Sequence, residues 1–186
     1  MQQSDNDPQS YEEALLTIIG HTPKEAKDKV SLSQHLHQAS QKYLNSPVSG
    51  WPDITFNWDT SRQSQHHTLD GTSPSRFTSL FSDGFLLGYV DVREFDSRLN
   101  HFSKRDEQEI WEVGFRDKLA RLLVYLSEGR PISPPLAKPL DSGEITLQGG
   151  HHRYTIAKFK GETEIPIYVE RQYQPAMARL LTVRWE

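Results

Sequence analysis

Cysteine is absent from all 186 residues of this sequence. A chain without cysteine forms no disulfide, offers no thiolate to zinc or to an iron–sulfur cluster, and has no thiol nucleophile. The sequence also lacks the run of about 18 apolar residues that would predict a membrane span. Residues 1–9 are polar and acidic, whereas a secretory signal begins basic and continues apolar. We therefore expect a soluble, cytoplasmic protein.

A strong positive charge is missing as well. The 21 Lys and Arg residues stand against 25 Asp and Glu residues, which gives a formal net charge of -4. The whole chain thus differs from a typical basic nucleic-acid-binding domain, and any DNA contact must come from a local patch. Residues 148–160 contain no acid and include Arg153, Lys158 and Lys160. We expect DNA to bind there, weakly and with a strong dependence on salt.

Two helices are predicted at the N-terminus. Ser10 and Thr22 are each followed three residues later by a glutamate, which is the capping-box pattern of a helix start. Gly20 is expected to end the first helix, because glycine is typical of helix C-termini. The second helix is expected to extend to about residue 45. We interpret residues 1–56 as an N-terminal helical appendage.

A polar stretch follows a short strand that is predicted at residues 54–56. Residues 57–75 are rich in Ser, Thr, Gln, Asp and His and contain almost no apolar side chains. Such a composition favours an exposed loop. We therefore interpret residues 57–80 as a polar linker.

Residues 81–186 are predicted to form one α+β unit. Apolar periodicity and turn residues predict a strand at 89–95 leading into a loop, a helix at 103–128, a hairpin of strands at 136–140 and 144–147, a helix at 151–159 and a strand at 165–169. Ser103 is expected to cap the long helix, and a break at Gly114 would divide it in two. Strands and helices in this order are typical of α+β folds.

The most informative local feature is the turn before the helix predicted at 151–159. Gly149 and Gly150 occupy this turn, and His151, His152 and Arg153 open the helix. Glycine permits a positive φ and a close approach to the backbone. The N–H groups and positive dipole end of a helix attract anions, and an arginine fork and imidazoles add further donors. These five residues are therefore predicted to bind the phosphates of a nucleotide; a tight turn with merely solvated histidines is the alternative.

Three segments around this turn carry a family resemblance: Pro134-Pro-Leu, the run from Gly143 to Tyr154, and Glu164-Ile-Pro-Ile-Tyr-Val169. Together they resemble the ParB/sulfiredoxin superfamily over a little under half of the chain. The resemblance implies a ParB/sulfiredoxin-like fold with an N-terminal helical appendage. It also implies that Gly150, His152 and Arg153 contact the phosphates of ATP or CTP.

Two branches of this superfamily fit the sequence poorly. Sulfiredoxins have a reducing cysteine where this chain has His151, and repair of a sulfinic acid needs that thiol. Partition proteins carry a long helix-turn-helix domain after the shared unit, whereas sixteen residues follow Glu170 here. We therefore expect neither activity.

The remaining members are nucleases, NTPases and small-molecule kinases. The resemblance implies an ATP-hydrolysing DNase, bacterial and plasmid-encoded, that inhibits fertility by blocking DNA transfer through a type IV secretion system or by acting on relaxase-linked DNA. Two alternatives stay open. One is a non-catalytic nucleotide-sensing module that inhibits a partner by contact, and the other is a small-molecule kinase.

Hydrolysis of ATP or DNA usually needs a divalent metal held by carboxylates. Glu94 and Asp96 are the candidate ligands for Mg²⁺ and the candidate groups for orienting water. Arg98 is expected to stabilise developing charge, and His152 is expected to hold phosphate during catalysis. In an extended strand, Asp91 and Arg93 would share one face while Glu94 and Asp96 share the other, so the loop must begin by Glu94 if all three acids serve one metal.

Overall fold

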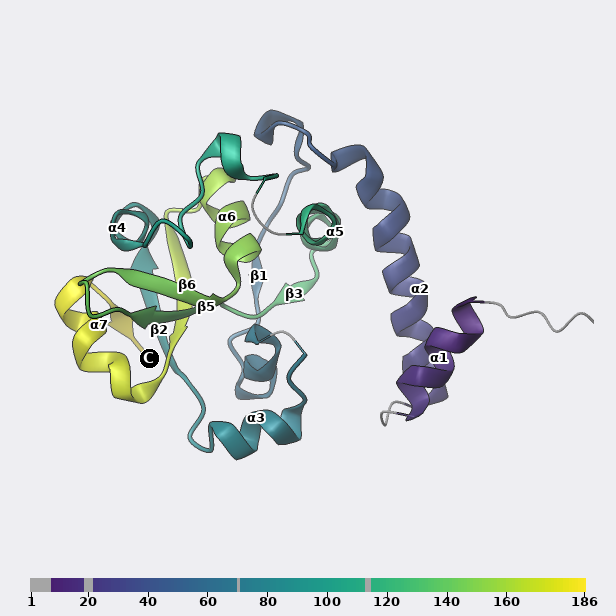
Figure 1. The fold of residues 1–186 in the computed structure, drawn as a ribbon, viewed down its shortest axis with the longest axis horizontal. Helices are drawn as coiled ribbons and strands as arrows, with labels where there is room; N and C mark the ends of the chain where they lie inside the picture. The colour runs from purple at the N-terminus through teal and green to yellow at the C-terminus, as the bar shows by residue number, and fades with distance from the viewer. Residues whose placement is uncertain (1–7, 19–21, 70, 113–114) are drawn as a thin grey trace, which may run out of the picture.

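The computed structural model describes residues 8–18, 22–69, 71–112 and 115–186. Its centre is a five-stranded sheet in the order β5-β4-β6-β2-β7 (Figure 1). The strands are β2 (Leu86–Asp91), β4 (Leu136–Pro139), β5 (Ile145–Gly149), β6 (Glu164–Val169) and β7 (Arg184–Trp185). Strands β4 and β6 are parallel and the other neighbours are antiparallel. The expected α+β class is therefore confirmed, with a mixed sheet.

The helices in the described ranges are α1 (Pro8–Ile18), α2 (Pro23–Ser40), α3 (Pro74–Leu80), α4 (Val92–Arg98), α5 (Arg116–Ser127), α6 (His151–Phe159) and α7 (Gln174–Leu180). Short 3₁₀ segments are η1 (Gln41–Tyr43), η2 (Val48–Gly50), η3 (Arg62–Thr68), η4 (Glu107–Glu109) and η5 (Arg171–Tyr173). A second, two-stranded parallel sheet pairs β1 (Asn57–Trp58) with β3 (Pro131–Ile132).

Helix α6 lies at the centre of the packing, because both of its sides are covered. Tyr154 and Ala157 belong to the apolar cluster that includes the sheet residues Ile165 and Ile167. Ile156 points into a second cluster, which contains Leu119, Leu123 and Leu126 of α5 together with Trp51. Residues 153–157 are consequently all buried. The start of α6 is thus held rigidly between the sheet and α5.

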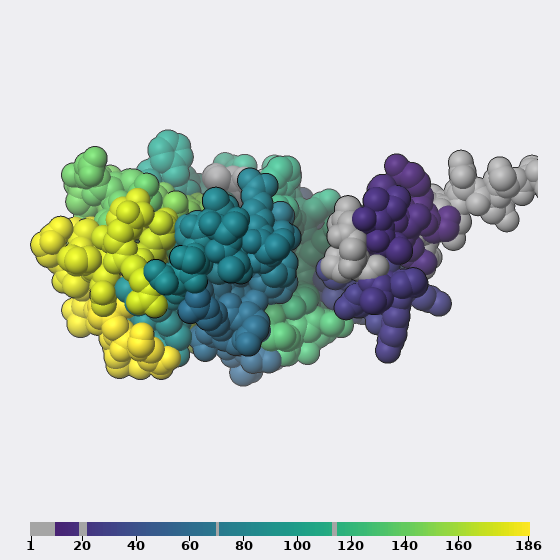
Figure 2. All heavy atoms as spheres, turned by 90° about the horizontal axis from the view of Figure 1, so that it is seen from below, coloured from purple at the N-terminus to yellow at the C-terminus, as the bar shows by residue number. Residues whose placement is uncertain are grey.

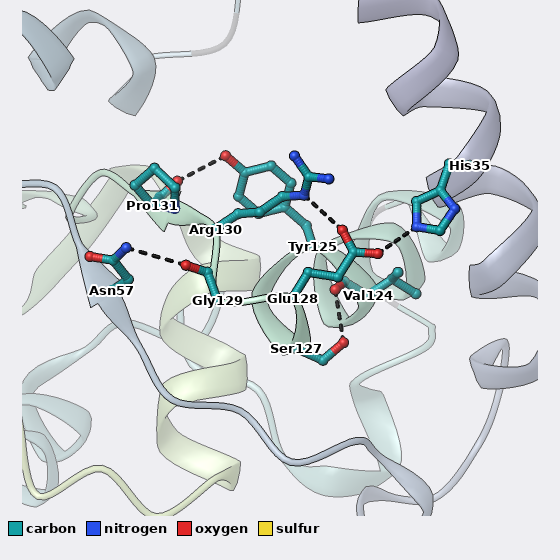
Figure 3. A network of polar contacts seen from close by, with 9 residues as sticks. All are labelled: His35, Asn57, Val124, Tyr125, Ser127, Glu128, Gly129, Arg130 and Pro131. Atoms are coloured by element: carbon teal, nitrogen blue, oxygen red, sulfur yellow. Dashed lines mark hydrogen bonds and ion pairs between the residues drawn. The ribbon is translucent and has the colours of Figure 1, made fainter. Parts of the chain in front are cut away.

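The N-terminal helices form one end of the molecule, beyond α5 (Figures 1 and 2). The capping box at Thr22 is present and begins α2 as predicted. Helix α2 packs against α5, where His35 contacts the Glu128 carboxylate and Arg130 Nε donates to the same carboxylate at 2.7 Å (Figure 3). Close by, the Tyr125 hydroxyl donates to the Pro131 carbonyl at 2.9 Å. The contact between His35 and Glu128 joins the appendage to the C-terminal end of α5.

The segment after β2 differs from the prediction. Strand β2 ends at Asp91, whose carboxylate accepts a hydrogen bond from the Glu94 N–H at 2.8 Å and so caps α4. Glu94, Asp96 and Arg98 therefore lie on a helix, and the predicted strand at 89–95 is wrong beyond Asp91. Val92 and Phe95 of this short helix are three residues apart, which is a helical spacing, but Val92 also continues the alternation of strand β2 and so favours a longer strand.

The polar stretch 57–80 is also not an exposed loop. Segments η3 and α3 occupy most of it, and Ser64, Gln65 and Thr68 are buried. The Gln65 amide exchanges two hydrogen bonds with the backbone of Phe85, and the Thr68 hydroxyl donates to the Pro134 carbonyl at 2.6 Å. A polar composition predicted an exposed loop, but polar side chains are buried in this segment because they hydrogen-bond to backbone groups.

The remaining elements agree with the sequence to different degrees. The hairpin of β4 and β5, helix α6 and strand β6 are confirmed. Helix α1 begins at Pro8, so Ser10 lies inside it, and β1 lies just after the strand predicted at 54–56. Among the described residues of the helix predicted at 103–128, only those of α5 and η4 are helical. The buried Ser103 hydroxyl accepts the Leu147 N–H at 2.8 Å instead of capping. The breaks predicted at Gly20 and Gly114 lie outside the described residues.

Candidate functional site

A cleft of about 750 Å³ lies at the N-terminus of α6. Its floor is the turn from Gln148 to Arg153, which includes all five residues predicted to bind nucleotide phosphates. One wall is a face of α5 with Phe115, Lys118, Arg121, Leu122 and Tyr125; the rest comes from Leu36, Asp59, Ser64, His67, Arg105 and residues 131–133. Ligand sites commonly have this size and this mixture of apolar and polar lining.

The two glycines of the turn are required by the packing of the chain itself. Gly150 has a φ of +87°, as the sequence predicted, and a Cβ there would lie 2.7 Å from Pro135 Cα. A Cβ on Gly149 would lie 2.2 Å from the Thr68 carbonyl oxygen. Both positions therefore exclude larger residues irrespective of any ligand. Because Gly150 has no side chain, no side-chain cap covers the first turn of α6, whose N–H groups have no intrahelical acceptor.

Arg153 has a different role from the predicted phosphate fork. Its side chain is buried, and Nη1 donates to the Ser133 carbonyl at 2.7 Å, the Ser133 hydroxyl at 2.8 Å and the Pro134 carbonyl at 3.2 Å. Nη2 donates to the carbonyls of Thr68 at 3.2 Å and His67 at 3.4 Å. The guanidinium thus links α6 both to η3 and to the segment that precedes β4. Arg153 lines the cleft as part of its frame.

Arg105 is the feature of the cleft that sequence reasoning missed. Its side chain is only 6% exposed, and its Nε and Nη1 have no hydrogen-bond partner. No carboxylate in the described part of the chain forms an ion pair with it, and burial alone lowers its pKa. A buried cation without a counter-ion is costly, and an anion in the cleft would offset this cost. Arg105 lies in a loop that is far from the turn in sequence but lines the same cleft, so no local motif predicts it.

The electrostatics of the cleft favour an anion. Lys118 and Arg121 of α5 add two further cations, and Asp59 carries the only carboxylate among the described lining residues. Burial first, and then the charges of Arg105 and Arg153, lower the pKa of His151. Burial and the neighbouring His66 and Lys29 lower the pKa of His67. Both imidazoles are therefore neutral at pH 7, because protonation would add charge to an already positive cleft.

The predicted catalytic residues of α4 lie outside this cleft. None of Glu94, Asp96 and Arg98 lines it. Glu94 Oε1 accepts the Thr182 N–H at 3.0 Å. The half-buried Asp96 accepts hydrogen bonds from the Tyr154 hydroxyl at 2.5 Å and from Lys158 Nζ at 2.9 Å. Although burial opposes ionisation, these donors lower the pKa of Asp96.

These contacts do not fit the predicted Mg²⁺ site. Glu94 accepts a backbone N–H, and Asp96 is neutralised by Lys158 and by Lys104, whose Nζ lies 3.4 Å away. Among the described residues no group of three or more His, Asp or Glu side chains could hold a metal ion. The predicted DNA patch is also divided, since Arg153 is buried and Lys158 pairs with Asp96.

Comparison with protein-family models, with curated proteins and with solved structures gives no match for this chain. The likeness to the ParB/sulfiredoxin superfamily therefore stays a prediction, which rests on the segments around the turn. No helix in the described ranges is long and apolar enough to cross a membrane.

Proposed function

We propose that this protein binds a nucleoside polyphosphate, such as ATP, in the cleft at the start of α6. The buried and unpaired Arg105 carries the proposal, because two of its nitrogens lack an acceptor and an anion beside it would supply both an acceptor and a counter-charge. The uncapped N-terminus of α6 and the cations Lys118 and Arg121 supply further attraction for phosphates. The apolar side chains Leu36, Leu122 and Ile132 provide a surface for the nucleoside.

The same geometry favours a nucleotide-binding module over an enzyme that uses the residues of α4. A phosphate held at the α6 turn would lie in a cleft that Glu94, Asp96 and Arg98 do not line. The ATPase and DNase activities, and a block of DNA transfer through a type IV secretion system, are expectations that rest on the family resemblance alone. Nucleotide sensing with inhibition by contact needs only the cleft and a docking surface.

Calorimetric titration of the purified protein with ATP and with inorganic triphosphate tests the proposal. We expect both to bind, with an affinity that falls as salt is raised, because charged contacts in an open cleft are screened. The absence of binding by either anion at low salt would contradict it. Measurement of ATP turnover and DNA cleavage with Glu94→Gln alongside separates the module from the enzyme: activity abolished in this variant would favour the enzyme.

A further inference from the structure

The rim of the cleft carries an exposed aromatic ring. Phe115 lines the cleft at the N-cap of α5, yet its side chain is 71% exposed. Its carbonyl accepts the N–H groups of Lys118 and Leu119, at 3.0 and 3.3 Å, so the backbone at this position is fixed by the first turn of the helix. A lone exposed phenylalanine needs no explanation by itself, and its place beside the cations of the cleft is what distinguishes Phe115.

Phe115 and Lys118 form a combined aromatic and cationic surface. The Lys118 ammonium lies 5.3 Å from the centre of the Phe115 ring. The other aromatic ring of the α5 wall is less accessible, since Tyr125 is partly buried in the cluster around α5 and its hydroxyl donates to Pro131. Phe115 is therefore the aromatic residue of this wall that is available for a ligand.

Resting on the proposed function, we infer that Phe115 is the stacking platform for the base of the bound nucleotide. Binding sites for nucleotides and single strands combine a positive groove with an aromatic ring on which a base stacks. Here the phosphates bind at the α6 turn beside Arg105, while the base covers Phe115 and removes its ring from water. The cleft then prefers a phosphate that carries an aromatic base over an inorganic phosphate chain.

The sequence offers a matched control for this role. Phe102 is also strongly exposed, at 81%, but it does not line the cleft. Phe102→Ala removes the same side chain from the surface without touching the proposed platform. Phe115→Trp keeps an aromatic ring, and Phe115→Leu keeps an apolar side chain without one.

Calorimetry with ATP and inorganic triphosphate on these variants is the test. We expect Phe115→Ala and Phe115→Leu to lower the affinity for ATP about tenfold, in line with the lower part of the range for base stacking. The affinity for triphosphate should stay unchanged. Phe115→Trp and Phe102→Ala should bind ATP like the original protein.

Equal ATP affinity of Phe115→Ala and the original protein would overturn the platform while leaving the nucleotide site intact. So would an equal loss of ATP and triphosphate, which would indicate a disturbed cleft. If neither ligand binds the original protein, the proposed function fails and the platform fails with it.

Discussion

Two arginines line the same cleft and are almost equally buried, with 6% exposure for Arg105 and 7% for Arg153. Their surroundings are opposite. Arg153 donates to backbone carbonyls of two neighbouring segments and to the Ser133 hydroxyl, whereas Arg105 leaves two of its nitrogens without a partner. Arg153, which belongs to the recognisable motif, therefore builds the cleft, whereas Arg105, which lies outside the motif, is the arginine that we propose contacts a ligand.

The largest expected effect is on the stability of the frame around Arg153. Arg153→Met should lower the free energy of unfolding by about 2–5 kcal/mol, because several buried carbonyls lose a charged donor. Arg105→Met removes an unpaired buried charge and should leave the free energy of unfolding unchanged or raise it. Urea denaturation of both variants measures the difference. Equal losses would show that the two arginines have the same structural role.

A second test addresses the frame without changing any charge. Gly149→Ala places a methyl group 2.2 Å from the Thr68 carbonyl oxygen, and we expect a loss of about 1–3 kcal/mol from overpacking. Gly143→Ala is the control, since a Cβ there meets nothing within 4 Å and only its φ of +82° is strained. The thermal midpoint should fall further for Gly149→Ala. An unchanged midpoint would show that η3 is not held tightly against the turn.

Burial lowers the pKa of His151, and the charges of the two arginines lower it further. The stability of the protein should therefore depend on pH. A histidine whose pKa is lowered by folding contributes stability above its unfolded value of about 6.5, and this stability is lost as pH falls below that value. We expect the midpoint of thermal unfolding to fall when the pH is lowered from 7.5 to 5.5, and to fall less in His151→Gln.

Sulfate should reduce the same loss, because an anion beside His151 favours its protonated form. Thermal denaturation at the two pH values, with and without sulfate at constant ionic strength, gives the result. An identical drop in the original protein and in His151→Gln would contradict a neutral His151 at the cleft.

The smallest effect is expected at the attachment of the appendage. Glu128 contacts His35 and Arg130 (Figure 3), and these contacts, first the hydrogen bond from His35, lower the pKa of Glu128. Glu128→Gln weakens both contacts. The contacts are largely exposed, so the free energy of unfolding should fall by about 0.5 kcal/mol or less. ATP affinity should stay the same. A large loss of ATP affinity would show that α2 controls the cleft more strongly than its single lining residue, Leu36, indicates.

The sequence predicted the part of the site whose geometry is local. Positive φ at Gly150, the helix that follows and the strands on either side are set by residues close together in the chain. Arg105 could not be predicted, because its loop is held near the turn by the hydrogen bond between Leu147 and Ser103. The role of Arg153 could not be predicted either, since its acceptors are mostly backbone carbonyls, which every residue type possesses.

The acids of α4 differ from the prediction in their secondary structure and in their contacts. Their carboxylates and their place after a strand make Glu94 and Asp96 candidate metal ligands in the sequence. In the structure a helix begins at Val92, and both side chains have other partners. The Asp96 carboxylate already accepts from the Tyr154 hydroxyl and from Lys158, and these donors compete with a metal for its oxygens. The helix start is local, because Asp91 caps it, whereas the partners Thr182 and Lys158 lie far away in sequence.

The most direct test of the account is the affinity of Arg105→Met for ATP, measured by calorimetry beside its unfolding free energy. We expect a loss of at least about tenfold in affinity, the lower end for a charge-assisted contact of 1.5–3 kcal/mol, with a fold at least as stable as that of the original protein. Unchanged ATP affinity in a folded Arg105→Met protein would contradict the claim that this unpaired arginine holds the ligand's phosphates.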